Sequence, residues 1–180
     1  MLDAARTLFE RAATPSEVSM DQIAAAASVG KGTLFRRFGD RDGLVRALVE
    51  AKTTPLLQEI ESGPPPLGPA AAPAERLCAV LAAIVDVKIE TVALSLAHES
   101  GTSSPYAAEG YRATHAVVAS LLTELRFSGD AGIAAHVLLA ATRADLIAVL
   151  VRAEERTRDE IVDGVVGCAR ALVRRDAGLE

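Results

Sequence analysis

The sequence predicts an all-α protein with two helical domains, and three observations support this fold class. Alanine, leucine and valine dominate a chain of 180 residues that is 50% hydrophobic, and alanine and leucine are strong helix formers. Apolar residues recur at the three- and four-residue spacing of amphipathic helices, whereas no segment alternates as a strand would. The stretch SGPPPLGPAAAP, residues 62–73, contains five of the eight prolines and therefore indicates a linker between two groups of helices.

The first two helices are predicted from periodicity and from a capping signal. Apolar residues at helical spacing predict a helix over 2–12, which ends before Pro15. Ser19 is followed three residues later by Gln22 and then by an apolar run, which is the pattern of a capping box. The second helix is therefore expected to begin near Ser19 and to reach residue 27.

Two further helices precede the linker. After a short break at residues 28–30, a third helix is predicted over 31–38. Asp40 can cap a fourth helix that begins at residue 41. Pro55 is expected to stop or kink this helix, because proline lacks an amide donor and clashes with the preceding turn. We place the domain boundary in the fourth helix, which gives an N-terminal domain over 1–46 and a C-terminal domain over 47–180.

The remainder of the chain is helical in pattern. The breaks are expected at residues 101–105, at 128–129 and in the charged stretch 152–159. The predicted helices cover residues 74–87, 88–99, 105–127, 131–153 and 157–175.

Composition limits the possible functions. The formal net charge of −5 excludes a uniformly basic surface but not a local basic face, since phosphate binding depends on where charge lies. Cys78 and Cys168 are interpreted as buried thiols of a cytoplasmic protein, with neither a disulfide framework nor a metal site. No signal peptide is recognised, and the longest uncharged apolar run, 131–142, is too short to span a bilayer.

The second and third predicted helices form a candidate helix-turn-helix, because only about three residues join them. In this motif the second helix enters the major groove of DNA. If Leu34 and Phe38 face inward, Arg36 and Arg37 are free to face outward, where a guanidinium can bind guanine edges or phosphates with two hydrogen bonds. The side chains expected to be buried between the helices are Ile23, Val29, Leu34 and Phe38, with the small Ala24 at the close approach.

Residues 2–50 resemble the DNA-binding domain of the TetR family of bacterial repressors. The matching segments are LDAARTLFE and VSMDQIAAAASVGKGTLFRRFGDRDGLVRALV, in this order. The resemblance implies an all-helical homodimer that binds a near-palindromic operator in double-stranded DNA, without a cofactor, and that a small-molecule effector releases. The DNA contacts that it implies are Ser19, Met20, Lys31, Gly32, Thr33, Phe35, Arg36, Arg37 and Arg41.

The sequence departs from the family pattern in four places. The family carries a basic arm before the first helix, whereas this sequence starts at Met1. Ser28 stands where the family has a turn glycine, and a positive φ there would cost about 1 kcal/mol. Gly30 replaces a serine cap, and Phe35 replaces a tyrosine, so a phenolic bond to phosphate is absent.

The C-terminal domain is expected to hold a ligand pocket. Ligand sites are mostly apolar with a few placed polar groups, and the domain has few polar aromatic side chains among many alanines, valines and leucines. The candidate pocket residues are Leu77, Leu81, Ile84, Leu94, His98, Tyr106, Tyr111 and His115.

The last two predicted helices carry wide apolar faces, which fit either an internal core or, as the resemblance implies, a two-fold interface between subunits. Charged Arg143 and Asp145 lie within this apolar region, where a buried charge needs a partner across the interface. The candidate interface residues are Leu138, Ala141, Asp145, Ile161, Val165 and Leu172.

The sequence thus favours a DNA-binding transcriptional regulator, specifically a repressor released by a ligand. The alternative is a small-molecule-binding protein on the same scaffold that has lost or weakened DNA binding. An enzyme ranks last, because no nucleophile–base pair or metal-binding pattern occurs among the histidines and carboxylates.

Overall fold

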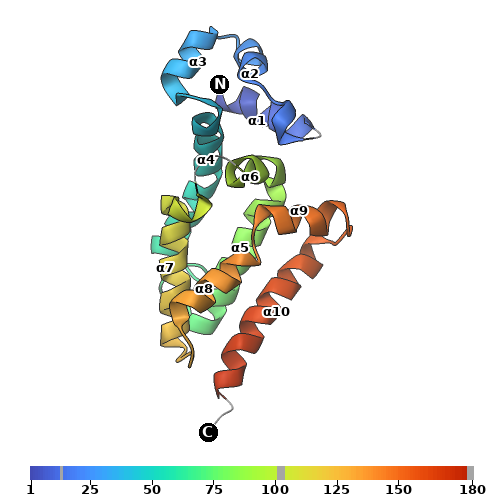
Figure 1. Ribbon diagram of the computed structural model, residues 1–180. Coiled ribbons are helices and arrows are strands. Elements are labelled where there is room, and N and C mark those ends of the chain that lie inside the picture. The colour runs from blue at the N-terminus through green and yellow to red at the C-terminus, as the bar shows by residue number, and fades with distance from the viewer. Residues whose placement is uncertain (13, 101–103, 178–180) are drawn as a thin grey trace.

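The computed structural model describes residues 1–12, 14–100 and 104–177, and every regular element in these ranges is a helix. The predicted all-α fold is therefore confirmed. The three short N-terminal helices lie at one end of an elongated molecule, most of the C-terminal helices lie toward the other, and α4 runs between the two groups (Figure 1). This arrangement leaves α2 and α3 accessible at the tip.

The N-terminal end contains α1 (Leu2–Arg11), the 3₁₀ turn η1 (Pro15–Glu17), α2 (Met20–Ala26) and α3 (Lys31–Phe38). The predicted capping box is present: the Ser19 hydroxyl accepts from the Gln22 amide, and the Ser19 amide donates to Gln22 Oε1 at 2.8 Å. The side chains of Phe9, Ile23 and Leu34 are fully buried in the core that these helices share.

The long helix α4 (Arg41–Ser62) connects the two ends. Asp40 caps it as predicted, accepting from the Gly43 amide at 2.7 Å. Of the two outcomes expected at Pro55, a stop or a kink, the stop does not occur, because α4 continues for two further turns to Ser62. One proline removes a single amide donor, and apolar contacts of Leu56 and Ile60 with the C-terminal core anchor the segment beyond it.

The proline-rich stretch after α4 is held against the helices that flank it. Arg76 on the following helix donates to the carbonyl of Leu67 at 2.9 Å and to that of Ile60 at 2.7 Å. The guanidinium therefore ties the stretch to both α4 and α5, so it is a compact connection rather than a spacer between independent domains.

The C-terminal helices differ from the predicted ones at two positions. The helix predicted over 131–153 is divided at residues 141–143, where the Thr142 hydroxyl donates to the Leu139 carbonyl at 2.9 Å. The helix predicted from 105 begins later, and the preceding break includes residues 101–103, which lie outside the described ranges. The elements are α5 (Pro73–Glu90), α6 (Val92–Glu99), η2 (Pro105–Ala107), α7 (Glu109–Glu124), α8 (Ala131–Ala140), α9 (Ala144–Arg152) and α10 (Arg158–Ala177).

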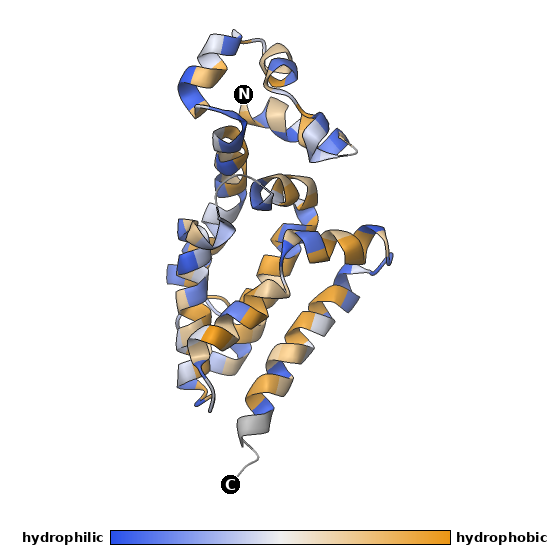
Figure 2. Cartoon of the chain, in the orientation of Figure 1, coloured by the Kyte–Doolittle hydropathy of each residue, from blue (hydrophilic) through white to orange (hydrophobic). Residues whose placement is uncertain are grey.

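Two hydrophobic cores follow from this arrangement. The larger core joins α5, α7, α8, α9 and α10, and Figure 2 shows hydrophobic residues along α5, α8 and α10. The smaller core belongs to the N-terminal helices, but Leu94 and Ala97 of α6 are also part of it. Helix α6 is thus built into the N-terminal core, although the predicted boundary assigns it to the C-terminal domain 47–180.

Residues 131–152 form one stretch that is long and apolar enough, by length and composition, to cross a membrane. In the structure this stretch is divided between α8 and α9. Leu138, Leu139 and Ile147 on these two helices are buried in the larger core. Packing within the chain therefore accounts for part of its apolar character.

Candidate nucleic-acid interface

The turn between α2 and α3 is fixed by backbone hydrogen bonds. The Val29 amide donates to the Ala24 carbonyl, and the Ser28 amide donates to the Ala25 carbonyl, at 3.0 and 3.1 Å. This pair of bonds is a Schellman motif, which requires a left-handed residue after the helix end. Ser28 fills that position with φ 54°. The expected strain at this serine, about 1 kcal/mol relative to glycine, is therefore present.

Helix α3 has an inward and an outward face, as predicted. Leu34 is fully buried, and Phe38 and Val29 are half-buried against the N-terminal core. Phe35 on the opposite side remains 38% exposed. The other outward residues, all exposed, are Lys31, Gly32, Thr33, Arg36 and Arg37.

The positive charge of the outward face is concentrated on two arginines. Lys31 forms an ion pair with Asp21 at 2.6 Å, so part of its charge is already compensated. Neither Arg36 nor Arg37 forms an ion pair within the described ranges. These two guanidinium groups, on consecutive positions of α3, are therefore available to an external anion such as a phosphate or a guanine edge.

Two of the predicted DNA contacts are instead structural. Met20 is buried in the N-terminal core, so its side chain does not reach the surface. Arg41 is half-buried and turns inward, donating to the carbonyls of Pro15 at 2.5 Å and Val18 at 3.2 Å. Its guanidinium also lies over the Phe9 ring. Arg41 therefore clamps η1 and α1 to α4, because its guanidinium donates to two carbonyls between α1 and α2 and lies over a ring of α1.

We expect Arg41→Ala to lower the free energy of unfolding by about 2 kcal/mol, since it removes charge-assisted bonds to two carbonyls. The salt dependence of DNA binding should stay unchanged, because the side chain faces the protein. Thermal unfolding and a salt titration measure the two effects, with the exposed Arg46→Ala as the control. A reduced salt slope with unchanged unfolding would restore Arg41 as a phosphate contact.

The C-terminal domain contains a cluster of polar aromatic rings between α7 and α8. Tyr111 packs edge-to-face on Tyr106, with ring centroids 5.2 Å apart, and its hydroxyl lies 2.6 Å from Nδ1 of His136. The His115 and His136 rings are 4.0 Å apart, and His115 Nε2 donates to the Gly132 carbonyl. Burial and the neighbouring Tyr106 raise the pKa of Tyr111. The sequence interpretation found three of these four residues and missed His136.

A charged network continues from this cluster to α6. Arg143 Nη1 lies 3.5 Å from the Tyr106 hydroxyl and Nη2 lies 3.6 Å from Glu99 at the end of α6. Glu99, whose side chain is only 8% exposed, also pairs with Lys88 and accepts from the Ala144 amide at 3.0 Å. Nothing in the local sequence indicated this network, since its members come from α5, α6 and the start of α9.

The charged residues predicted to need a partner across an interface find partners within the chain. Arg143 and Asp145 pair at 3.2 Å, which lowers the pKa of Asp145 and raises that of Arg143. Asp145 itself is exposed. The charged side chain that is buried beside Arg143 is therefore that of Glu99, which the sequence interpretation did not select.

The predicted pocket residues are not brought together at one site. Leu77 and Leu81 belong to the larger core, whereas Leu94 belongs to the N-terminal core. Ile84 is packed against the larger core. His98 is half-buried on α6, where burial and then Lys88 lower its pKa. Tyr111 also packs against the larger core, and ring contacts join it to Tyr106 and His115.

Three predicted interface residues, Leu138, Ile161 and Val165, are buried in the core of their own chain. Ala141 and Leu172 pack partly against the same core. The apolar faces of these helices are wider than the area that the core covers. Other apolar residues therefore remain exposed on their outward sides. The exposed large apolar residues are Ile133, Val137, Leu146 and Val149 on α8 and α9. Exposed on α10 are Gly164, Gly167, Cys168 and Ala171.

The expectation of two buried thiols is also wrong. Cys168 is exposed on α10 and Cys78 is half-buried on α5. No group of three or more potential metal ligands occurs among the described residues.

Comparisons with known proteins agree with this geometry. Residues 1–48 match the sequence profile of bacterial regulatory proteins of the tetR family. A TetR-like transcriptional regulator from Rhodococcus sp. RHA1 aligns with a TM-score of 0.63 at 20% identity, over 99% of this chain and 94% of that chain. A putative fatty acid metabolism regulator from Clostridium perfringens aligns with a TM-score of 0.60 at 17% identity, over 92% and 93%. No curated protein sequence matches the chain.

A short-turn helix pair, anchored in a small core and carrying exposed cations on its second helix, defines a helix-turn-helix transcriptional regulator. The N-terminal domain of this chain is similar to that of the TetR family of bacterial regulatory proteins, whose profile matches residues 1–48. The two solved structures support the same fold for the chain as a whole.

Proposed function

We propose that the protein is a cytoplasmic transcriptional repressor that binds a near-palindromic operator as a homodimer and that a small-molecule effector releases. The observation that carries this proposal is the outward face of α3, where Arg36 and Arg37 are exposed beside Thr33. A helix with this face fits the major groove, where arginine reads guanine and threonine contacts a phosphate or a thymine methyl.

The effector acts, in this proposal, through the network that ends on Glu99. An effector that engages Tyr106 or Tyr111 competes for Arg143, which lies beside both Tyr106 and Glu99. Glu99 ends α6, and α6 supplies Leu94 and Ala97 to the N-terminal core. A ligand with different affinities for two positions of α6 therefore shifts the orientation of the reading helices.

The homodimer is supported by the outward faces of α8 and α10. Ile133 and Val137 are 64% and 63% exposed on α8, an unusual position for large aliphatic side chains. On α10, Gly164 and Gly167 leave open space around their backbone. Small residues allow helices of two subunits to approach closely, and a two-fold axis then places two α3 helices roughly 34–36 Å apart.

Footprinting on the DNA upstream of the protein's own coding region tests the proposal, together with binding titrations over a range of salt concentrations. We expect a protected, near-palindromic site and a steep fall of affinity with salt, because phosphate neutralisation releases counterions. A flat salt dependence without protection would favour the alternative, a small-molecule-binding protein that has lost DNA binding.

We expect Ile133→Asp with Val137→Asp to convert the dimer into a folded monomer. Two buried carboxylates at an interface would each need a partner that the apolar face lacks. Light scattering gives the mass and circular dichroism checks the helices. Ala113→Asp with Ala116→Asp, on the exposed side of α7, is the matched control. A dimer that survives the α8 changes would contradict this interface.

A further inference from the structure

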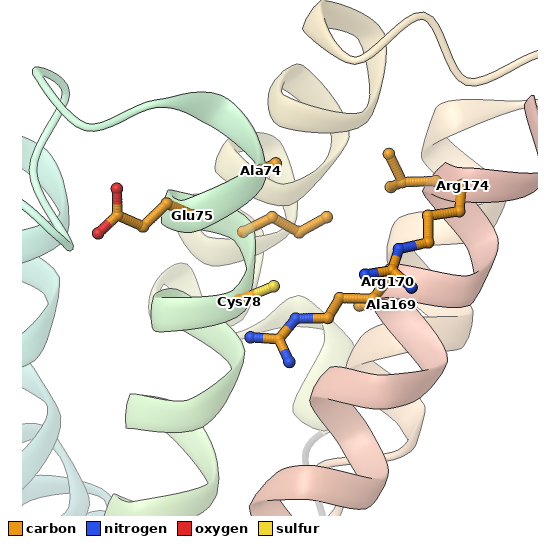
Figure 3. Close-up of a pocket in the computed structure, with 8 residues that line it drawn as sticks. Ala74, Glu75, Cys78, Ala169, Arg170 and Arg174 are labelled. Atoms are coloured by element: carbon orange, nitrogen blue, oxygen red, sulfur yellow. The ribbon is translucent and has the colours of Figure 1, made fainter. Parts of the chain in front are cut away.

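A groove of about 340 Å³ lies between the start of α5 and the end of α10. Leu77 and Ala169 are buried at its base, and Val173 and Cys78 are half-buried on its sides. Figure 3 shows that Arg170 and Arg174 extend from α10 into the space between the two helices, near Cys78. The groove thus combines an apolar base with two guanidinium groups.

The positive charge of the groove lies on its α10 side. Arg170 and Arg174 are one helical turn apart, and neither forms an ion pair with another described residue. Glu75 also lines the groove, but its carboxylate points away from both arginines (Figure 3). Two like charges at this spacing repel each other. An anion placed between them removes that repulsion and accepts several charge-assisted hydrogen bonds.

The groove lies apart from the network that we assign to the effector. Cys78 and Lys88 are ten residues apart on α5, which corresponds to about 15 Å along a helix. Glu99 and Arg143 are grouped with Lys88 at the far end of α5. The groove is therefore a separate feature, and its occupancy can be measured without DNA.

We propose that this groove binds a small amphiphile with one anionic head group. The head lies between Arg170 and Arg174, and the apolar tail covers Leu77, Cys78 and Val173. A wholly polar anion would leave the apolar base of the groove in contact with water. An uncharged apolar molecule would leave both guanidinium groups without an anionic partner. The volume is at the lower end of the about 300–1,000 Å³ of ligand pockets, so a short chain fits.

Cys78 provides a direct reporter of occupancy. In a Cys168→Ser protein, Cys78 is the only thiol, and the rate of its modification by the neutral reagent N-ethylmaleimide can be followed by mass spectrometry. Decanoate, below the concentration at which it forms micelles, is expected to slow this rate about tenfold at about ten times its Kd, by mass action. Decanol and acetate at equal concentrations are expected to leave the rate nearly unchanged.

Matched variants separate recognition from general effects. Arg170→Gln with Arg174→Gln should abolish protection by decanoate, whereas Arg11→Gln with Arg112→Gln, on exposed positions elsewhere, should retain it. Equal protection by decanol, protection by acetate alone, or protection that persists without both arginines would each overturn the proposal. Loss of operator binding would not contradict the proposal, because occupancy of the groove is measured without DNA.

Discussion

Replacing Arg36 and Arg37 together by alanine is expected to abolish specific binding to the operator at moderate salt. Each arginine contact to a base edge or phosphate contributes about 1–3 kcal/mol, so the double variant should bind at least about 30-fold more weakly. The protein should remain folded, because both side chains are exposed and their neighbour Leu34 carries the packing of α3. Gel-shift titration against the footprinted site measures the loss.

The control for this experiment is Arg112→Ala, which removes an exposed arginine from α7, distant along the chain from the reading helix. It should leave affinity and salt slope unchanged. Unchanged affinity in the Arg36 and Arg37 double variant would instead show that α3 is not the helix that binds the operator. A parallel loss of affinity in the control would indicate a non-specific effect of net charge.

Glu99→Ala is expected to lower the free energy of unfolding by about 2–3 kcal/mol, because it leaves Lys88 and Arg143 without their shared carboxylate. The Ala144 amide also loses its acceptor. For a chain of this size the melting temperature should fall by roughly 4–12 °C. Since Glu99 fixes the end of α6, the variant should also weaken the response of DNA binding to the effector.

Glu90→Ala provides the matched control, as Glu90 is exposed at the end of α5. Glu99→Gln keeps the shape and one acceptor but removes the charge, so its effect on unfolding should be intermediate. If Glu99→Ala melts like the unaltered protein, the network is not a structural connection between α6 and α9, and the coupling that we propose through Arg143 would need another route.

The parts of the interface that could be predicted have local causes. The capping box at Ser19, the Asp40 cap and the inward pair Leu34 and Phe38 each depend on residues within one turn of a helix. The strain at Ser28 also follows locally, because a Schellman motif requires a left-handed residue there. Sequence spacing is sufficient for such features.

The corrected predictions concern side chains whose direction depends on distant segments. Arg41 occupies a position that the family resemblance assigns to a phosphate contact. In the structure its guanidinium instead donates to the carbonyls of Pro15 and Val18. Leu138 and Ile161 lie on helices that also carry exposed residues, and periodicity alone does not say which face meets the core. The break between α8 and α9 at residues 141–143 contains neither glycine nor proline, so the sequence carries no signal for it.

By itself, the sequence determined the all-α class, the helix-turn-helix and the outward cations of α3, because these follow from periodicity, caps and turn chemistry within short segments. Tertiary structure alone decided that α6 is built into the N-terminal core, that Glu99 joins Lys88 to Arg143, and that Arg170 and Arg174 lie in a groove beside Cys78. Each of these features brings together residues far apart in the chain, and their proximity depends on how whole helices pack.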